Sequence, residues 1–456
     1  MKTLKIHTYL LWGILLLLAA CTTDHESDFP EERGNNLLCL TLTTNADSRT
    51  QIPDKDGTEA ESFIKSADIY LVNSTHTDVI GPMPIIVINS YGATEIPDGM
   101  TGEYYMYVVA NPTRTYSTES YDKFIGEYTI PNPSSVWEPY HFLMVNTTND
   151  IVTDTNDNNG GVKITIPGNA DVYATVNVER LAVKVEVKTD LITGENKTAN
   201  IKLIGQPVKG IDDASTTTIT DVVVEGSTLI NCISSYNLIQ QWSNGTNIVT
   251  MLDKPQDYSD VLLVTPSSTE GFTNYYNKPE NSDTEWNWTS AGTPMYCLEN
   301  NPPKYSDELP DTKAKGLPTG ILLKVKVSLG DDVVSDTFYR FGNRLYTSMQ
   351  ALRLDYPEDV VSSDNPGIKE YKDGYMYYTV YLKDDRYTMP ETDKYYFAVF
   401  RNSWNTISIK GISNFGKDEP GDEYDPEDPI DEEKEGINIE VRANFWTIIK
   451  TNHILK

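Results

Sequence analysis

Segments of strand length follow one another through the whole chain, and turn-forming residues separate them. Their Val, Ile, Thr and Tyr side chains favour the pleated surface of a sheet, whereas Gly, Pro, Asn and Asp end strands. Only residues 343–355 have a helical period, with Leu345, Met349 and Leu352 on one face of a predicted short helix. Many short strands without alternating helices predict an all-β chain built from β-sandwiches. The predicted strands are 66–73, 84–90, 103–112, 161–168, 174–189, 218–226, 260–267, 320–330, 374–383 and 405–416.

The length of the chain bears on the number of sandwiches. With 456 residues it exceeds what one ordinary hydrophobic core organises, so we predict two tandem domains. The segment 174–188 is long enough to close one sandwich and to lead into the next. We therefore predict an N-terminal domain at 50–190 and a second domain at 191–416, with the boundary placed to within roughly ten residues.

The N-terminus carries a targeting segment. Residues 1–20 join a basic start to an apolar run that is too short to span a membrane, which is typical of a signal peptide. The run ends in LAAC at Cys21, which resembles a bacterial lipobox. This resemblance implies cleavage before Cys21 and attachment of lipid, palmitate included, to Cys21; the alternative is an ordinary signal peptide with an incidental cysteine. The acidic segment 22–32 predicts a disordered tether.

The charge and the motif content exclude two classes of function. A formal net charge of −30 leaves no basic patch that outweighs the acidic surface, so nucleic acid is not expected as a partner. After the tether, the histidines are His76, His141 and His453, and none lies near a serine or cysteine nucleophile motif. Neither GxSxG nor HExxH occurs. We therefore predict a protein that is not an enzyme and that needs no cofactor.

Metal-ligand patterns are weak. Residues 154–161 (DTNDNNGG) are similar to a calcium loop, but Asn159 and Thr165 stand where an EF-hand needs Gly and Glu, so a turn is favoured. The spacing of the cysteines after Cys21 argues against zinc, and no metal site is predicted. An oxidising compartment would allow a disulfide between Cys232 and Cys297, while two separate buried thiols are the favoured alternative.

A strand is predicted near each end of the chain. Residues 37–44 carry Leu38, Leu40 and Leu42 on one face, and Arg49 follows this strand. At the other end, the acid- and proline-rich linker 417–435 has too little apolar surface to fold and leads to the segment 436–456. The self-repulsion of this linker is expected to discourage the last strand from folding back on its own chain; the alternative is an ordinary final strand that pairs within its own domain. The odd-numbered face of that last strand carries Ile437, Ile439, Val441, Phe445 and Ile449.

These two strands suggest a way to polymerise. The edges and grooves of sandwiches bind extended strands through main-chain hydrogen bonds. If the first strand is removed, a groove opens that the last strand of a neighbouring copy can fill. Such a contact runs from head to tail and does not close on itself, so it builds a polymer.

A set of motifs follows one another along the chain: the lipobox at Cys21, LTLTT…SR before Thr50, KSADIYLV (65–72), YVVANP (107–112), VNVERLAVKVEV (176–187), MYCLEN (295–300), VFRNSWNTISIKGISNFG (399–416) and INIEVRANFW (437–446). In this order they resemble the fimbrillin family of type V pili, and the shaft subunits of minor, Mfa-like fimbriae in particular. The family usually has Pro before the final Trp446, where Phe445 stands here, a departure that concerns the local bend and not the strand.

The resemblance implies two transthyretin-like β-sandwich domains and a processing pathway. A lipoprotein precursor reaches the outer membrane, and an arginine-specific, trypsin-like surface protease cuts between Arg49 and Thr50. The propeptide 21–49 then leaves with the first strand, and the opened groove accepts the C-terminal donor strand of another copy. The implied product is an extracellular fimbrium on the cell surface that supports adhesion, with accessory, tip and anchor subunits as further partners.

Two alternatives stay open at this point. The chain could be an anchor, tip or accessory subunit of the same fimbria. It could also be a surface glycan-binding β-sandwich lipoprotein that keeps its lipid and stays monomeric, with Trp286 and Trp288 as a sugar-stacking platform. Aromatic residues two apart on a strand more often share one face of a sheet, so packing is favoured for this pair. A secreted hydrolase has the least support, because no catalytic constellation is present.

Overall fold

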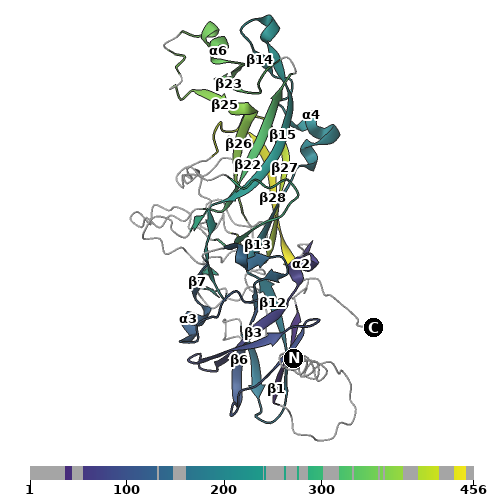
Figure 1. The fold of residues 1–456 in the computed structure, drawn as a ribbon, viewed down its shortest axis with the longest axis vertical. Helices are drawn as coiled ribbons and strands as arrows, with labels where there is room; N and C mark the ends of the chain where they lie inside the picture. Colours follow the sequence, from purple (N-terminus) through teal and green to yellow (C-terminus); the bar gives the residue numbers. More distant parts are fainter. Residues whose placement is uncertain are drawn as a thin grey trace, which may run out of the picture.

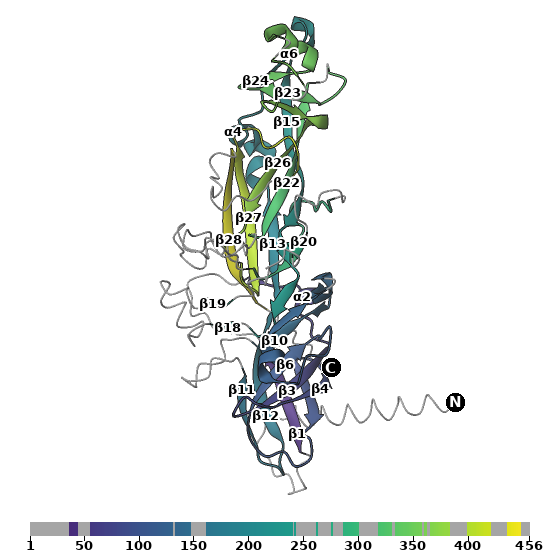
Figure 2. The ribbon, with the colours of Figure 1, turned by 90° about the vertical axis from the view of Figure 1, so that its left-hand side faces the viewer.

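The structure is a computed structural model, and it describes most of the chain after the N-terminal tether. The described residues are 36–43, 55–130, 133–146, 161–239, 241–242, 261–262, 275–276, 286–300, 318–330, 333–357, 360–362, 365–383, 399–420 and 436–447. They form an elongated molecule in which two β-structures follow each other along the long axis (Figures 1 and 2).

An eight-stranded sheet forms the half of the molecule that lies at the bottom of Figure 1. Its order is β4-β3-β6-β10-β12-β1-β5, and β11 also pairs with β6. The strands are β1 (Leu37–Thr43), β3 (Ser66–Asn73), β4 (Val79–Ile86), β5 (Tyr91–Glu95), β6 (Gly102–Ala110), β10 (Met144–Asn146), β11 (Val162–Ile166) and β12 (Val172–Arg180).

Both faces of the central strands in this sheet are buried. In β3, Ile69 and Leu71 belong to one apolar core, while Tyr70 and Val72 belong to the core on the opposite face. Strands buried on both sides carry nearly continuous apolar sequence, which is why SADIYLVN and EYYMYVVA show no clean alternation. The second of these cores is rich in tyrosine, and it is also lined by α3 (Tyr121–Ile125), β7 (Glu127–Thr129) and residues 233–239.

The chain passes from the first sheet to the second at Leu181. The segment predicted as one long strand is two strands, because β12 ends at Arg180 and β13 (Ala182–Lys188) pairs with different partners. β12 lies between β10 and β1, whereas β13 lies between β27 and β21. The segment thus leads from one β-structure into the next; the predicted domain limits stay a prediction.

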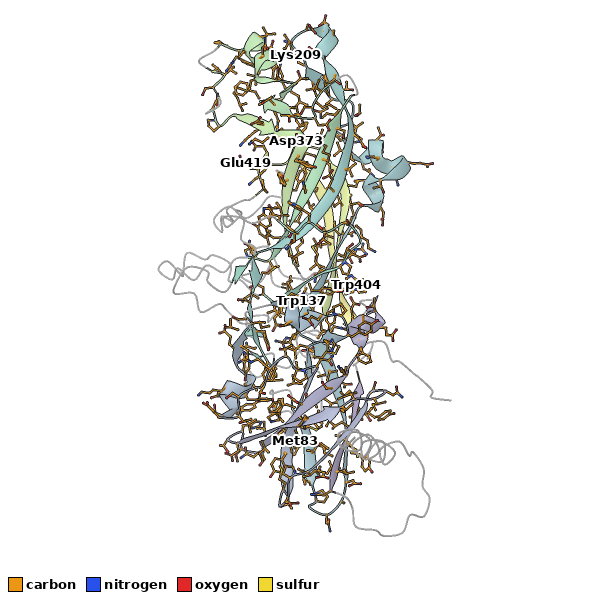
Figure 3. The ribbon with its side chains drawn as sticks, viewed as in Figure 1. Met83, Trp137, Lys209, Asp373, Trp404 and Glu419 are labelled. Carbon is orange, nitrogen blue, oxygen red and sulfur yellow. The ribbon has the colours of Figure 1, made fainter. Side chains whose placement is uncertain are left out.

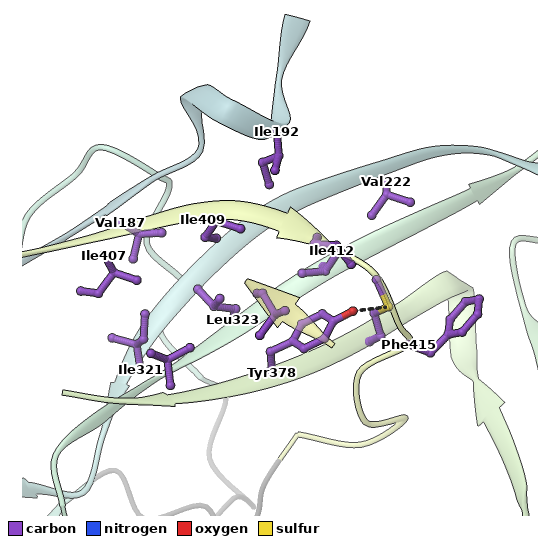
Figure 4. Packing of buried hydrophobic residues seen from close by; sticks show 14 of the residues in the cluster. Val187, Ile192, Val222, Ile321, Leu323, Tyr378, Ile407, Ile409, Ile412 and Phe415 are labelled. Carbon is purple, nitrogen blue, oxygen red and sulfur yellow. Dashed lines mark hydrogen bonds between the residues drawn. The ribbon is translucent and has the colours of Figure 1, made fainter. Parts of the chain in front are cut away.

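Two sheets pack face to face in the other half of the molecule. The five-stranded sheet has the order β2-β28-β27-β13-β21, and the seven-stranded sheet has the order β25-β23-β24-β14-β15-β22-β26. Val187, Ile407 and Ile409 of the first sheet meet Ile321 and Leu323 of the second in one core (Figure 4).

The strands of the five-stranded sheet are β2 (Lys55–Asp56), β13, β21 (Met295–Leu298), β27 (Ser403–Ile412) and β28 (Ile437–Thr447). Those of the other sheet are β14 (Pro207–Lys209), β15 (Thr217–Ile230), β22 (Gly320–Leu329), β23 (Phe338–Phe341), β24 (Arg344–Tyr346), β25 (Ile368–Tyr371) and β26 (Tyr375–Tyr381). The smaller elements are α2 (Glu59–Ser62), β8 (Trp137–Glu138), β9 (His141–Phe142), α4 (Lys197–Asn200), β16 (Cys232–Ile233), β17 (Ser235–Asn237), β18 (Gln241–Trp242), β19 (Val261–Leu262) and β20 (Tyr275–Tyr276), with short 3-10 turns at 133–136, 190–192, 194–196, 213–215 and 372–374.

The predicted short helix is present as α6 (Met349–Asp355). It begins after Ser348, whose hydroxyl accepts a hydrogen bond from the Ala351 N–H at 3.1 Å and so caps the helix. Leu352 is buried under the tip of the seven-stranded sheet, whereas Leu345 lies before the helix, in β24.

The described residues are built mainly of strands, with short helical segments between them. The prediction of an all-β chain is therefore confirmed. Among these residues, none of the helices has the length and apolar character needed to cross a membrane.

Candidate functional site: the two terminal strands

β1 fills a slot between two other strands. It runs parallel to β12, from Leu38 opposite Val172 to Thr43 opposite Asn177, and antiparallel to β5 on its other edge. Leu38, Leu40 and Leu42 are at most 3% exposed. They lie in the core formed by β3, β4, β6, β11 and β12. The predicted alternation of this strand is thus present, and each of its edges forms a ladder.

Specific contacts fix both ends of β1. At the start, the Leu37 N–H donates to the Asp171 carboxylate at 2.9 Å, and the Asn36 carbonyl accepts from the Ile96 N–H at 2.9 Å. Near its end, the Leu42 N–H donates to the Ser90 carbonyl at 2.8 Å. These contacts give the strand one register in the slot.

β5 is the weaker wall of this slot. Within the described part of the chain its only ladder is the one with β1, whereas β12 also pairs with β10. Loss of β1 therefore leaves a pre-formed edge on β12 and a β5 segment that has lost its partner.

β28 lies on its own chain. It pairs antiparallel with β27, from Ile437 opposite Ile412 to Phe445 opposite Ser403, with an irregularity at Gly411. Ile437 and Val441 are buried in the core of the second sandwich, and Ile439 packs against the same core. As predicted, these three side chains lie on one face of the strand.

The docking of β28 differs from the expectation that its acidic linker discourages it from folding back. The physical reason is competition for apolar surface. β1 occupies its slot in this chain, so the apolar face of β28 has only the core beneath β27 to cover. Transfer of β28 to a neighbouring copy stays a prediction.

A glycine sets the point where β28 begins. Gly436 has a φ of +71°, and an added Cβ would lie 2.1 Å from the Cβ of Asn414. Its carbonyl accepts hydrogen bonds from the Ser413 N–H at 2.7 Å and from the Ser413 hydroxyl at 3.0 Å. Only glycine adopts this conformation without strain in so little space.

The first residues of the predicted linker are also held by the sandwich. The Lys417 N–H donates to the Tyr377 carbonyl at 2.8 Å, and Asp418 lies 3.4 Å from the Lys369 ammonium. Figure 3 places Glu419 in the upper half of the molecule, while β1 lies near the bottom in Figure 1. The described start of the linker, residues 417–420, therefore lies far from the slot of β1.

The opposite face of β28 is polar. Glu440 points away from the core and lies 2.7 Å from the Lys410 ammonium and 2.6 Å from the Arg442 guanidinium. Hydrogen bonds from Lys410 and Arg442 lower the pKa of Glu440 below its ordinary value.

A buried ion pair lies where the two β-structures meet. The Glu61 carboxylate in α2 is 2.7 Å from the Lys184 ammonium of β13, and both side chains are at most 4% exposed. The Tyr296 hydroxyl donates to the same carboxylate at 2.6 Å, and the Thr58 N–H donates to it at 2.6 Å. Burial alone raises the pKa of Glu61, but the hydrogen bonds from Lys184, Thr58 and Tyr296 outweigh it, so the pKa lies below its ordinary value.

Arg180 completes this joint. Its guanidinium is fully buried, and it donates to the Glu61 carbonyl at 2.8 Å, to the Ser62 hydroxyl at 3.2 Å and to the Asn402 side-chain oxygen at 3.3 Å. The Lys184 ammonium also lies 3.5 Å from the ring centre of Trp404, which Figure 3 labels near the middle of the molecule. α2, β12 and β27 are therefore tied together at one place.

Sequence reasoning missed this joint. The pattern Thr58-x-x-Glu61 is that of a capping box, and it was available as a signal for the start of a helix. Nothing local indicated that the same Glu61 would meet Lys184, which is far away in sequence.

A second link supports the joint from the other side. β17 pairs antiparallel with β7, and the hydroxyls of Tyr116 and Tyr236 lie 2.9 Å apart. The buried Arg401 guanidinium binds Glu299, with Nε to Oε1 at 2.9 Å, and also donates to the Leu238 carbonyl at 3.1 Å. The two β-structures are thus joined by two separate polar networks.

Several predicted site residues lie outside the described residues. These are Cys21, Arg49, Thr50 and Ile449, and most of the loop 154–161 lies outside them as well. Phe445 and Trp446 are described only as backbone within β28. Among the described residues, no group of three or more His, Cys, Asp or Glu side chains is arranged to hold a metal ion.

The cysteine and tryptophan pairs have packing roles in the structure. Cys232 and Cys297 are free thiols, fully buried in the second core. Trp288 stacks on Tyr377, with ring centres 6.1 Å apart, and Trp286 joins it over Leu322 on the outer face of β22. This arrangement fits the shared sheet face better than a sugar platform.

The C-terminal part of the chain matches a protein-family model. Residues 369–452 match the C-terminal part of fimbrillin, described as a major fimbrial subunit protein of type IV. The matched range holds β26, β27 and β28, so it includes both the docked strand and its antiparallel partner β27. The predicted resemblance to fimbrillins is confirmed by this match. A search of curated proteins finds no match.

Three solved structures are similar to this chain over most of its length. A candidate cell adhesion protein from Parabacteroides distasonis is similar over 91% of this chain and 98% of its own, with 12% identity and a TM-score of 0.48. A fimbrilin from Porphyromonas gingivalis is similar over 91% of this chain and 99% of its own, with 12% identity and a TM-score of 0.45. The tip fimbrial protein Mfa3 of Porphyromonas gingivalis covers 90% of this chain and 100% of its own, with 11% identity and a TM-score of 0.38.

Proposed function

We propose that this chain is a structural shaft subunit of a fimbria. It is exported as a lipoprotein anchored through Cys21, trimmed at the cell surface between Arg49 and Thr50, and polymerised by passing β28 to the next subunit. The fimbrillin match supports a fimbrial role in adhesion, and the proposal adds the shaft position and the strand exchange. Its partners are further copies of itself, tip, accessory and anchor subunits, and an arginine-specific protease.

The observation that carries the proposal is the way β1 is attached. β1 is a strand with ladders on both edges, yet its only downstream covalent link to the rest of the fold is the segment 44–54. Arg49 is the only Arg or Lys in that segment. A trypsin-like cut within it therefore falls at Arg49, and it frees β1 without cutting any other described strand.

A strand in the slot of β1 gains more main-chain pairing than it has in the position that β28 leaves on β27. A strand in the slot has partners on both edges, β12 and β5, whereas β28 pairs along its length with β27 alone and has only the two residues of β2 on its other edge. Each ladder hydrogen bond contributes a net ~1 kcal/mol. Ile437, Ile439 and Val441 repeat the alternate spacing of Leu38, Leu40 and Leu42, and burying each such side chain contributes roughly 1.5–3 kcal/mol. An open slot thus favours the transfer.

The positions of donor and slot favour a head-to-tail contact. The described start of the linker, with Glu419, lies in the half of the molecule away from β1 (Figures 1 and 3). A released strand therefore starts from one half of a subunit and fills a slot in the opposite half of the next. Because the two surfaces differ, the contact is repeated along a line and builds a fibre.

The N-terminal residue of the surface protein tests the proposal. We expect cell-surface material to begin at Thr50, and Arg49→Ala to leave a monomeric, lipidated protein in the membrane fraction. Arg33→Ala is the matched control, because a cut at Arg33 lies before β1 and leaves the slot filled. Fimbriae that contain protein still starting at lipidated Cys21 would contradict both the cleavage and the shaft role.

A further inference from the structure

The segment that follows the proposed cut touches the strand that is to be released. β2 runs parallel to the end of β28, with Lys55 opposite Trp446 and Asp56 opposite Thr447. Lys55 is six residues after Arg49 in the sequence. The new N-terminus made by cleavage therefore lies close in sequence to the contact that covers the outer edge of β28.

The downstream side of β2 is fixed. Thr58 caps α2 directly after it, and the Glu61 carboxylate of α2 is held by Lys184 and Tyr296 at 2.7 and 2.6 Å. The Tyr140 N–H donates to the Ala60 carbonyl at 2.7 Å and holds the same helix from its other side. Whether β2 stays paired with β28 thus depends on the chain that precedes it, residues 44–54.

The upstream side changes when the chain is cut. In the intact chain, residues 44–54 join two fixed points, β1 in its slot and β2 on β28. A short segment with both ends held loses little further entropy when β2 stays paired. After cleavage at Arg49, residues 50–54 become a free chain end, and strands at free ends fray.

We propose that β2 is an autoinhibitory clasp that keeps the C-terminal end of β28 on its own chain until Arg49 is cut. This inference rests on the proposed strand exchange. One cleavage then has two effects. It opens the slot of β1, and it weakens the pairing that holds the end of β28 on its own chain. Peeling starts at Trp446 and Thr447 and runs toward Gly436, where the strand stays attached to the linker.

The clasp also explains why an uncut chain does not donate its strand too early. The paired length of β28 along β27 ends at Phe445, and the clasp holds the two residues that follow. With the clasp closed, each described residue of β28 is paired, so a neighbour's slot finds no frayed end among residues 437–447 from which to begin pairing.

Hydrogen–deuterium exchange of the amides at 443–447 measures the clasp directly. We expect these amides to exchange on the order of tenfold faster after an arginine-specific protease has cut the full-length precursor at Arg49, because a pair of ladder hydrogen bonds is lost. The double variant Lys55→Pro and Asp56→Pro removes both N–H groups, and it is expected to show the same increase without any cut. Lys55→Ala with Asp56→Ala keeps the backbone donors and is expected to match the uncut wild type.

A cross-link provides a test that does not depend on proline. Asp56→Cys and Thr447→Cys, oxidised with a small-molecule disulfide, tie β2 to β28 at paired positions. We expect the cut, cross-linked protein to stay monomeric and to polymerise once a reductant is added, while each single variant polymerises throughout.

The outcomes separate the clasp from the proposed function. If cut wild-type protein polymerises but exchange at 443–447 does not change and the cross-link does not block assembly, the clasp is wrong and the strand exchange stands. If exchange at 443–447 increases on cutting but the cut wild-type protein does not polymerise, the clasp stands and the shaft role is overturned.

Discussion

At the scale of single residues, the joint between the two β-structures depends on buried charges. Glu61 and Lys184 neutralise each other with almost no access to water. Removing one partner of such a pair leaves the other as an unpaired buried charge, which lowers the free energy of unfolding by roughly 3–5 kcal/mol. Replacing both by neutral groups is often tolerated. The joint therefore responds to changes at either member of the pair.

A charge-removal series tests this joint. We expect Lys184→Met to lower the free energy of unfolding by roughly 3–5 kcal/mol and Glu61→Gln with Lys184→Met to restore a large part of it. The measurement is urea unfolding followed by circular dichroism. Equal losses in the single and double variants would show that the ion pair does not matter in this way.

The pH dependence follows from the same carboxyl. Because the folded pKa of Glu61 lies below its ordinary value, its contribution to stability is complete above the unfolded pKa near 4.5. That contribution is lost as the pH falls through the lower, folded pKa. We expect the urea midpoint of the wild type to fall more than that of the double variant between pH 7 and the pH range below 4.5. A parallel fall in both proteins would contradict this expectation.

The two cysteines of the trimmed protein give a further residue-scale prediction. A chain that begins at Thr50 keeps only Cys232 and Cys297. A hydrogen bond with Cys232 and burial both raise the pKa of the Cys297 thiol, so little thiolate is present. We expect a thiol reagent to label neither cysteine in the folded protein and both after unfolding. An absence of labelling after unfolding would mean that the pair is oxidised to a disulfide.

At the scale of elements, the sequence predicts which face of a strand is buried better than it predicts which strands pair with each other. Alternation identified the apolar faces of β1 and β28 because period-two burial is a local property. Parallel pairing of β1 with β12, and of β13 with β27, joins residues far apart in the chain, and no local pattern encodes it. The break at Leu181 was missed for the same reason, since β12 and β13 are both apolar and differ only in their partners.

Two substitutions in β28 compare its faces. Val441→Asp places a charge against the core, and we expect it to abolish polymerisation and to lower the stability of the uncut protein by about 3 kcal/mol or more. Glu440→Lys replaces a partly exposed carboxylate beside Lys410 and Arg442, on the face away from the core, so its effect is expected to be within about 1 kcal/mol. The assays are thermal unfolding and ladders of unboiled surface extract. Polymerisation by Val441→Asp at the wild-type level would rule out this face as the one that is buried.

At the scale of the whole molecule, the removable strand and the joint are independent of each other. β1 leaves the slot between β12 and β5, whereas Glu61, Lys184, Arg401 and Glu299 hold the two β-structures together without it. Trimming is therefore expected to leave a folded protein that can still receive a strand.

Deletion of residues 437–456 separates donation from acceptance. We expect the trimmed, truncated protein to keep its β-sheet circular dichroism signal and to accept a donor strand while offering none. Mixed with intact subunits, it should shorten fibres in proportion to its share, as seen by electron microscopy. Full-length fibres made from the truncated protein alone would show that β28 is not the link between subunits.

The seat of β1 has a further consequence for fibre length. An uncut chain has its slot filled and its last strand held on its own chain, so it neither accepts nor donates a strand. A cut chain is bifunctional, as a monomer in a step-growth polymerisation is. Proteolysis at Arg49 therefore sets the supply of polymerisable subunits, and with it the rate at which fibres lengthen.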